Sequence, residues 1–560
     1  VLQLRYYAFP PYGIGILKRN LEKRDYTVRL EDLNYRVLAA IHQAEGSITT
    51  PEDLTRIWQT QLRNAIEAFK PDIVGLSCMY TMTHDITIRN AEFIKSIRSD
   101  LPVIVGGVHA TTSMETVLHA SPAIDLVALY EGDTHFGDLL DFARGLRESD
   151  TLAQIALRLD GATAVLAERS TPRAEEIQES PDFGDLPIGD YSRVGQVGIF
   201  NFWYGATARA ASLMANRGCR ARCSFCSVRH FNGPGVRQRE AARVVEEMTH
   251  LKRAYGVTHF TWLDDDLFYN TKKCLELFDA MANANLGMTW DASNGVLASS
   301  VVNHPEIIDA AARAGCIGLG FGIETGSERL LRQVHKPCTI KHFRKLGGIM
   351  KHHPEIFTKG FLMLGFPGET VREIKQTIAL AQEMRLDWYS VQVVSPLPTT
   401  EMFNQFADTE GWERGTLHFG IRESERQKKV ESSGHQNFFR LLDADDDSIP
   451  DATELYHIWF DFDFSVNYPR LFKEDNPTRL KKIQFFLTDV CDRRVGSNPI
   501  PNLFLALVNA KLGLFQDVER RVGMAREFFR RTHYWNQRLQ GLGIELDDLI
   551  HRCRTAPRVN

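Results

Sequence analysis

The sequence of 560 residues lacks three features that would assign it to a membrane, to secretion or to nucleic acid. A helix that spans a bilayer needs about 20 mostly apolar residues, and no stretch of that kind occurs. No charged-then-apolar secretory leader opens the chain. The 66 basic and 71 acidic side chains give a net charge of -5, which provides no basic footprint for nucleic acid. We therefore expect a cytoplasmic protein with no membrane span and no nucleic-acid partner.

Cysteine is also scarce, with nine residues in the chain. An odd number of cysteines without a secretory leader argues against a disulfide scaffold and favours reduced thiols in a cytoplasm. Three of them, Cys219, Cys223 and Cys226, nevertheless fall within eight residues. This clustering is the strongest chemical signal in the sequence.

The length exceeds what one hydrophobic core ordinarily supports, so we expect several α/β and helical domains. Residues 1–150 alternate short apolar runs with helical stretches, which is typical of a Rossmann-like, doubly wound sheet. Strands are expected there at Val1–Tyr6, Val28–Leu33, Ile73–Ser77, Val103–Gly106 and Asp125–Leu129. Residues 151–200, acidic and interrupted by proline over Glu175–Pro187, are predicted to be a linker.

A second alternation of strands and helices covers residues 201–400 and predicts a partial (β/α)6 barrel. Its strands are expected at Ala210–Ala215, His259–Leu263, Thr289–Ala292, Cys316–Gly322, Phe357–Leu364 and Trp388–Val394. The alternation then stops, so residues 401–560 are predicted to form a mostly helical C-terminal domain. Within it, Pro501–Leu512 and Gln516–Arg530 read as a helical hairpin broken at Gly513. Four aromatic side chains there either line a substrate pocket or, as we favour, pack a small core: Trp459, Phe460, Phe462 and Phe464.

The three cysteines follow the first strand of this second series with the spacing C-x3-C-x2-C. A 4Fe–4S site takes four ligands, so three cysteines in one loop leave one iron open to another molecule. An open position marks catalytic metal sites in general. His230, four residues after Cys226, leaves open a Cys3His zinc site in a zinc-stabilised binding protein without catalysis. The position of the loop, at a strand end that opens a repeated βα series, favours the cluster.

In this setting the sequence resembles the radical S-adenosylmethionine (SAM) enzymes. The resemblance implies that the three cysteines bind a 4Fe–4S cluster, whose open iron holds the amino and carboxylate groups of SAM. It also implies that Phe225 lies near the adenine and that four further residues contact SAM: Asp264, Asp265, Glu324 and Gly365. These lie in the segments Thr261–Asp266, Gly322–Ser327 and Gly360–Thr370. Each segment alone could be an ordinary turn or helix cap, but their order at successive strand ends favours a cofactor site.

Residues 1–400 as a whole resemble the cobalamin-binding class of radical SAM enzymes. The resemblance assigns cobalamin to the carboxyl ends of the strands in the first domain, at Tyr12, Ser77, Tyr80, Gly106, Gly107, His109, Glu131 and Gly132. Taken alone, Gly106 and Gly107 would equally suit the tight turns of a generic flavodoxin-like domain. The motif D-x-H-x-x-G, whose histidine ligates cobalt in many cobalamin proteins, is absent, and Asp133-Thr134-His135 is only a near match. No cobalt-ligating histidine is therefore assigned, including His109.

The resemblance implies that the reduced cluster cleaves SAM to methionine and a 5′-deoxyadenosyl radical, which abstracts hydrogen from an unactivated position. The leading hypothesis is a biosynthetic methyltransferase that methylates a carbon or phosphorus of a small-molecule or natural-product precursor through methylcobalamin. The alternative is an oxidative cyclase or rearrangement enzyme that uses both cofactors without methyl transfer. An external reductant such as flavodoxin or ferredoxin is an expected partner. No catalytic acid or base is assigned, because the cofactors would carry the chemistry.

Overall fold

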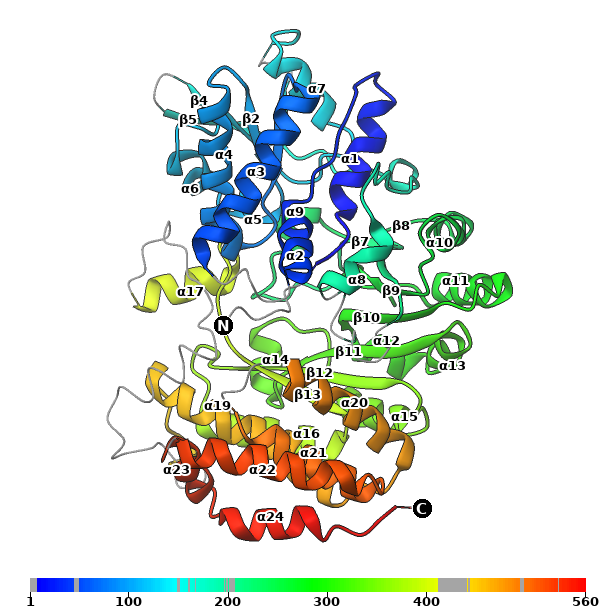
Figure 1. Cartoon of the computed structure of the whole chain (residues 1–560), viewed down its shortest axis with the longest axis vertical. Coiled ribbons are helices and arrows are strands. Elements are labelled where there is room, and N and C mark those ends of the chain that lie inside the picture. The colour runs from blue at the N-terminus through cyan, green and yellow to red at the C-terminus, as the bar shows by residue number, and fades with distance from the viewer. Residues whose placement is uncertain are drawn as a thin grey trace. The chain divides into compact units, whose positions relative to one another are not determined.

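The structure is a computed structural model that describes residues 8–44, 50–148, 152–159, 162–166, 168–195, 197, 200, 207–410, 441, 444–493, 498–531 and 533–559 (Figure 1). The chain divides into two compact units. The first consists of Val1–Gly198, Thr207–Met288 and Pro396–Phe419. The second consists of Ile199–Ala206, Thr289–Ser395 and Gly420–Asn560.

The first sheet has five strands in the order β1-β2-β3-β4-β5. They are β1 (Val74–Ser77), β2 (Val103–Gly106), β3 (Leu126–Ala128), β4 (Ile155–Leu159) and β5 (Ala162–Leu166). Strands β1, β2 and β3 are parallel, whereas β4 and β5 continue the sheet antiparallel. The accompanying helices are α1 (Tyr12–Glu22), α2 (Leu33–Gln43), α3 (Pro51–Phe69), α4 (His84–Ile97), α5 (Val108–Thr112), α6 (Met114–Ala120) and α7 (Phe136–Ala143). The α/β class predicted for this part is confirmed.

Strand β2 shows why these residues form a central strand. Successive side chains of a strand point to opposite faces of its sheet. Val103 and Val105 pack into one buried cluster, while Ile104 between them packs into another. A strand buried on both faces is a continuous apolar run, as expected for a parallel sheet covered by helices on both sides.

Two expectations for the first 200 residues are corrected. Val28–Leu33 is not a strand, because Leu33 begins α2 and Asp32 caps that helix by accepting a hydrogen bond from the Tyr35 amide. Strands β4 and β5 lie within residues 151–200, where the composition predicts a linker, and β4 pairs with β3. Such edge strands depend on pairing with a distant neighbour, which local composition does not report. The strand expected at Val1–Tyr6 falls outside the described residues.

The second sheet has six strands in the order β13-β12-β11-β10-β9-β6. They are β6 (Ala210–Leu213), β9 (His259–Trp262), β10 (Thr289–Val296), β11 (Cys316–Glu324), β12 (Phe357–Leu364) and β13 (Trp388–Val393). The pairs β6–β9, β10–β11, β11–β12 and β12–β13 are parallel. Helices that follow the strands include α10 (Ala241–Tyr255), α11 (Thr271–Ala284), α13 (Glu306–Arg313), α15 (Ile340–Met350) and α16 (Val371–Met384). The six strands and the parallel sheet of a partial barrel are confirmed.

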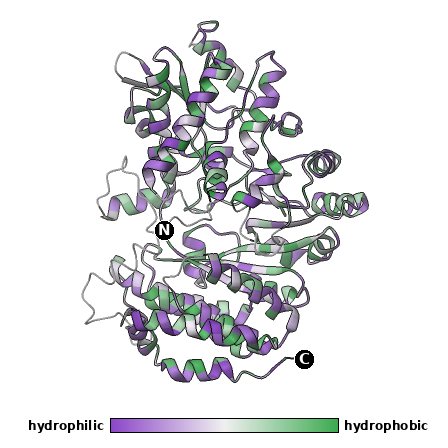
Figure 2. Cartoon of the chain, in the orientation of Figure 1, coloured by the Kyte–Doolittle hydropathy of each residue, from purple (hydrophilic) through white to green (hydrophobic). Residues whose placement is uncertain are grey.

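The C-terminal region is helical, as predicted. It contains α19 (Ala452–Asn467), α20 (Pro477–Arg493), α21 (Ile500–Lys511), α22 (Phe515–Arg531), α23 (His533–Gly541) and α24 (Leu546–Arg554). Helix α21 is buried along its whole length and packs against α20, α22 and α24. Gly513, at a φ of 76°, ends the first helix of the predicted hairpin. Figure 2 shows apolar and polar residues alternating along these helices.

The aromatic residues of α19 belong to the core rather than to a pocket. Phe460, Phe462 and Phe464 are all buried, and Trp459 donates its indole N–H to the Val391 carbonyl at 2.9 Å. The favoured expectation, that these side chains pack a core, is confirmed. No helix in the described part of the chain is long and apolar enough to cross a membrane.

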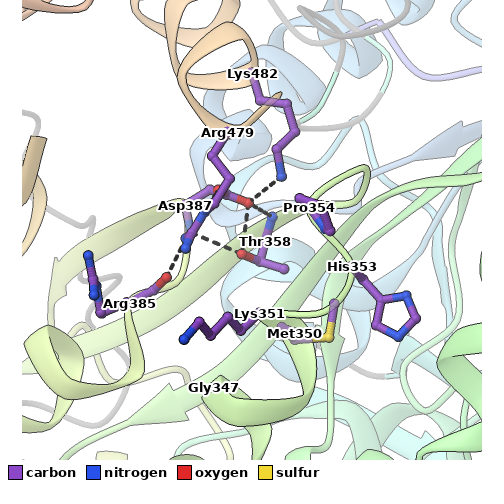
Figure 3. A pocket seen from close by; sticks show the side chains of 10 residues that line it. All are labelled: Gly347, Met350, Lys351, His353, Pro354, Thr358, Arg385, Asp387, Arg479 and Lys482. Atoms are coloured by element: carbon purple, nitrogen blue, oxygen red, sulfur yellow. Dashed lines mark hydrogen bonds and ion pairs between the residues drawn. The ribbon is translucent and has the colours of Figure 1, made fainter. Parts of the chain in front are cut away.

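A buried ion-pair cluster joins α20 to the start of β13 (Figure 3). Asp387, only 1% exposed, accepts hydrogen bonds from the Thr358 amide at 2.8 Å and the Thr358 hydroxyl at 2.9 Å. Lys482 and Arg479, both on α20, pair with the same carboxylate at 2.8 and 3.0 Å. The cluster therefore holds the helical region on the strands β12 and β13.

We expect Asp387→Ala to destabilise the fold by about 3–5 kcal/mol, because it leaves the Lys482 ammonium buried without its partner. Burial alone would raise the pKa of Asp387, but Lys482 and Arg479 outweigh it and lower the pKa to about 2. A carboxyl with a depressed folded-state pKa contributes stability above its unfolded pKa of about 3.9, and loses it as pH falls towards 2. Thermal unfolding of both proteins should therefore differ most near neutral pH and converge in acid. Asp309→Ala, on the more exposed carboxylate that pairs with His353, is the control.

Candidate functional site

The cysteines lie in a loop, residues 218–227, that is closed at its root by a small antiparallel ribbon. Strand β7 (Asn216–Arg217) leads into the loop, and β8 (Arg237–Gln238) pairs with it after α9 (Val228–Asn232). Gly218 has a φ of 84°, and a Cβ there would meet the Gly235 carbonyl oxygen at 2.6 Å, so only glycine suits the turn. We call residues 218–227 the cysteine loop and β7 with β8 the β7–β8 ribbon.

The cysteine side chains suit a cluster held near a surface. Cys219 and Cys223 are partly buried and Cys226 is exposed. The Ala221 amide donates to the Cys219 sulfur at 3.4 Å, as it would to a thiolate ligand. Among the described residues, no three His, Cys, Asp or Glu side chains gather closely enough to hold a single metal ion. A 4Fe–4S cluster takes one thiolate per iron, so its cysteines stand further apart than the ligands of one ion.

Three consecutive aspartates after β9 support this loop. Asp264 is buried, and its carboxylate accepts hydrogen bonds from the Ala215 amide at 3.0 Å and the Asn216 amide at 2.5 Å. Burial raises the pKa of Asp264 to about 8 and that of Asp265 to about 6. Asp265 accepts from the Asn232 side-chain amide at 3.0 Å, at the end of α9. Their expected contacts with SAM stay predictions, whereas their contacts with the residues on either side of the cysteine loop are direct.

Asp266 was not singled out by the sequence, although it belongs to the same acidic segment. It pairs with the Arg220 guanidinium at 3.0 Å, and its carboxylate lies 4.0 Å from the Cys219 sulfur. Asp266 thus contacts the cysteine loop directly, at Arg220 and beside Cys219. The sequence does show Asp266 as the third of three consecutive aspartates. It does not show which of the three contacts the cysteines, because that depends on the partners that the fold brings to each carboxylate.

The remaining residues expected to contact SAM, Glu324 and Gly365, lie at strand ends in the second unit. Glu324 ends β11 at a φ of 66°, an unfavourable conformation for a non-glycine residue that tends to mark functional sites. Its carboxylate accepts from Lys336 at 2.7 Å, and both side chains are largely buried. Gly365 follows β12 at a φ of 89°, and its amide donates to the buried carboxylate of Glu369 at 2.6 Å. The helix cap proposed as the ordinary alternative is made by Ser327, which accepts from the Leu330 amide, and not by Glu324.

Some residues expected to bind cobalamin gather at the carboxyl ends of β1 and β2. Ser77 and Gly106 are register partners that end the two strands. Gly107, at a φ of 112°, lies so close to β1 that a Cβ would meet the Cys78 carbonyl oxygen at 2.6 Å. Tyr80 is 58% exposed, and Met79 and Met82 beside it are also exposed. An exposed apolar group beside a glycine turn fits the face of a large planar macrocycle.

His109 is buried next to a second histidine. Its Nε2 atom lies 3.0 Å from Nδ1 of His84, and its own Nδ1 atom is buried with no hydrogen-bond partner in the described structure. Burial lowers the pKa of His109 to about 4, so the ring is neutral near pH 7. A neutral ring with an unsatisfied nitrogen can serve as a hydrogen-bond or ligand atom, and the cobalamin contact of His109 stays a prediction.

Tyr12 and Glu131 lie in polar networks within the first unit. The Tyr12 hydroxyl accepts from Arg239 at 3.0 Å and donates to Glu247 at 3.3 Å, and all three side chains are buried. Glu131, followed by Gly132, forms ion pairs with Arg217 and Arg237. Both arginines belong to the β7–β8 ribbon, and neither was singled out from the sequence. The expected corrin contacts of Tyr12, Glu131 and Gly132 stay predictions.

Two protein families match separate parts of the chain. The B12 binding domain matches residues 1–140, and the Radical SAM superfamily matches residues 214–381. The second match includes the cysteine loop and the strands from β9 to β12. It therefore favours the iron–sulfur cluster over the zinc site that the sequence alone left open.

Curated relatives cover most of this length at low identity. An uncharacterized methyltransferase of Pyrococcus horikoshii, PH0819, is 27% identical over 379 residues, which is 65% of this chain and 76% of the relative. The cytidylyl-2-hydroxyethylphosphonate methyltransferase of Streptomyces wedmorensis is 24% identical, covering 70% and 77%. The anaerobic magnesium-protoporphyrin IX monomethyl ester cyclase of Rubrivivax gelatinosus is also 24% identical, covering 62% and 61%.

Two solved structures share the fold. The radical SAM methyltransferase TsrM of Kitasatospora setae, with cobalamin and a 4Fe–4S cluster bound, matches with a TM-score of 0.57 at 18% identity, covering 72% of this chain and 73% of TsrM. The cobalamin-dependent SAM radical enzyme OxsB, with aqua-cobalamin and SAM bound, matches with a TM-score of 0.52 at 15% identity, covering 95% and 81%. The chain therefore joins a B12 binding domain to a radical SAM domain and shares its fold with cobalamin-dependent radical SAM enzymes, and these two domains imply a 4Fe–4S cluster, SAM and cobalamin as cofactors.

Proposed function

We propose that this enzyme is a methyltransferase that acts on a small-molecule or natural-product precursor. The observation that carries the proposal is the presence of a B12 binding domain and a C-x3-C-x2-C radical SAM loop in one chain whose first relatives are named methyltransferases. When bound, the three cofactors supply radical generation and a transferable methyl group. The protein's own residues hold these groups and exclude water from them.

We propose the following roles from the resemblance to radical SAM enzymes and from the contacts described above. Cys219, Cys223 and Cys226 ligate the cluster, and Phe225 between them lies by the adenine. Asp264 and Asp265 hold the residues that flank the cysteine loop, Asp264 through the backbone amides before it and Asp265 through the end of α9. Glu324 and Gly365 shape the SAM site from β11 and β12. Ser77, Tyr80 and the turn Gly106–His109 meet the corrin.

A cyclase that uses the same cofactors is the second candidate. The relative from Rubrivivax gelatinosus is named as a cyclase, and its identity of 24% equals that of the phosphonate methyltransferase. The motifs described above are needed for cofactor binding in both reactions, so they favour neither. The methyltransferase and the cyclase differ in whether a methyl group is transferred from SAM to cobalamin.

The test uses the holoprotein before any substrate is known. The protein is purified without oxygen, reconstituted with iron, sulfide and hydroxocobalamin, reduced with titanium(III) citrate, and given SAM. A methyltransferase should transfer the SAM methyl to the reduced cobalt, forming methylcobalamin and S-adenosylhomocysteine in equal amounts, as measured by liquid chromatography and mass spectrometry. A cobalamin-loaded protein that forms neither product would contradict the methyltransferase proposal and favour the cyclase. A reconstituted protein without iron or cobalt would contradict both.

We expect Glu324→Gln to weaken SAM binding about tenfold or more while leaving the iron content unchanged. The substitution keeps the size of the side chain, but it removes the charge that Lys336 faces at 2.7 Å and replaces one acceptor oxygen with an NH2 donor. Isothermal titration of SAM into the reconstituted protein measures the dissociation constant. Glu328→Gln, a neighbouring carboxylate on α14 (Glu328–Gln333) that bonds the Ile340 amide, is the control. An unchanged SAM dissociation constant in Glu324→Gln would show that Glu324 does not serve this cofactor.

A further inference from the structure

The segment that follows β3 carries two carboxylates, Glu131 and Asp133, whose side chains are only 6% and 7% exposed. Arg217 contacts Asp133 at 2.7 Å and Glu131 at 3.5 Å. Arg237 contacts the other oxygen of Glu131 at 2.5 Å. Both arginine side chains are 12% exposed, so all four charges are largely removed from water. We call Glu131 and Asp133 the β3 carboxylates.

The two arginines stand opposite each other at the root of the cysteine loop. Arg217 on β7 is the register partner of Arg237 on β8, and Arg217 precedes Cys219 by two residues. Arg237 also donates to the Asn232 carbonyl at 2.9 Å, which ends α9. The β3 carboxylates therefore form ion pairs with β7, which enters the loop, and with β8, which follows it.

A second set of contacts joins the same segment to the residues after the cysteines. The Arg169 guanidinium lies 4.1 Å from the centroid of the Tyr130 ring and donates to the carbonyls of Arg229 and His230 on α9. The Gln154 side chain donates to the Glu131 carbonyl at 3.2 Å. The peptide from Tyr130 to Asp133 is thus tied to both flanks of the cysteine loop.

The four buried charges make the position of each side chain depend on its partners. A buried ion pair gives little net stability because each charge loses its hydration, but removing one partner leaves the other uncompensated. Two carboxylates and two guanidinia balance here, so the position of the β7–β8 ribbon depends on the position of the β3 carboxylates. Cys219, the first cysteine of the loop, follows Arg217 by two residues, so a shift of the ribbon would also move this cysteine.

We propose that Glu131 and Asp133 are positioning residues for the iron–sulfur cluster. Through Arg217 and Arg237, the B12 binding domain holds the root of the cysteine loop, so that the domain which carries cobalamin also determines where the cluster lies. The inference rests on the cofactors assigned above. It gives Glu131 a role at the cluster in place of the expected corrin contact.

The test compares Glu131→Gln with the wild type as reconstituted holoprotein. Iron and cobalamin contents, the electron paramagnetic resonance spectrum of the reduced cluster, and its midpoint potential are measured. We expect unchanged cobalamin, at least a halving of the iron retained after desalting, and altered g values of the cluster that remains. Asp138→Asn removes one carboxylate charge from α7, where Asp138 pairs with Arg24 and Arg147, and should match the wild type in every measurement.

Two results would overturn the proposal. A tenfold loss of cobalamin affinity with unchanged iron and an unchanged spectrum would show that Glu131 meets the corrin. A Glu131→Gln protein that matches the wild type throughout would show that the β3 carboxylates do not position the loop. If the wild-type protein itself took up no iron, the assignment of the cofactors would be wrong. The iron content of the wild type therefore distinguishes a failure of the proposed function from a failure of this inference.

A double variant keeps the test decisive if Glu131→Gln fails to fold. Replacing both partners of a buried pair removes the uncompensated charge that a single replacement leaves. Glu131→Gln combined with Arg237→Gln should therefore recover more iron than Glu131→Gln alone, as a double-mutant cycle would record. A double variant that is no better than the single one would contradict the pairing on which the proposal depends.

Discussion

Cys223→Ala is expected to yield a protein without a 4Fe–4S cluster and with SAM cleavage at background. In the proposed site, the cysteine loop supplies three thiolates and leaves one iron open, so the loss of one more ligand leaves half of the four positions unfilled. In the described part of the chain, no group of three or more His, Cys, Asp or Glu side chains gathers as an alternative metal site. Iron analysis, the visible absorption of the cluster and the release of 5′-deoxyadenosine measure the result.

Another cysteine supplies the control for Cys223→Ala. Cys491 lies on α20 and packs beside the core of the C-terminal helices. Cys491→Ala should keep its cluster and cleave SAM at the wild-type rate, which shows that the effect is specific to the loop. A brown, active Cys223→Ala protein would remove the central assignment of the cysteine loop.

Gly107→Ala is expected to lower cobalamin affinity at least about tenfold while leaving the iron content unchanged. Even the smallest side chain has no room: its Cβ would lie 2.6 Å from the oxygen and 2.9 Å from the carbon of the Cys78 carbonyl. That carbonyl also accepts the His109 amide at 3.2 Å, so a shift would disturb the turn after β2 and the loop after β1 together. The φ of 112° adds strain of about 1–3 kcal/mol for any residue other than glycine.

The measurement for Gly107→Ala is a titration of hydroxocobalamin into anaerobic protein, with iron analysis of the same sample. Gly13→Ala is the matched control, since Gly13 lies in α1 and a Cβ there would meet nothing within 4 Å. Thermal unfolding shows whether the fold survives each substitution. Full cobalamin loading of a folded Gly107→Ala protein would place the corrin elsewhere.

Local patterns accounted for most of the second sheet. Strand β12 has the bounds predicted from its apolar run, and Thr370 caps α16 with Glu373 in a capping box that the sequence displays. The cysteine spacing was equally local, because a loop that holds one cluster must carry its ligands within a few residues of each other. These features depend on neighbours along the chain, so one sequence was enough to predict them.

Most of the failures have the opposite cause, and Val28–Leu33 is the exception because its helix cap is a local contact. Val28–Leu33 has the residues of a strand, yet a capping contact from Asp32 begins a helix there. Strands β4 and β5 form because β4 pairs with the edge of β3, and β5 then pairs with β4. Asp264 meets amides that lie 48 and 49 residues earlier in the chain, and no periodicity indicates such a partner.

The sequence by itself indicated the two cofactor-binding domains and their cofactors, and it predicts the cysteine ligands, because these depend on residue types at fixed short spacings. Only the tertiary structure decided what the polar residues around them do. Tyr12 is joined to Arg239 and Glu131 to Arg217 across 227 and 86 residues. The free-energy cost of burying a charge depends on the opposite charge that lies beside it in the folded protein. Packing between segments distant in the sequence determines which charges become neighbours, so local sequence does not report it.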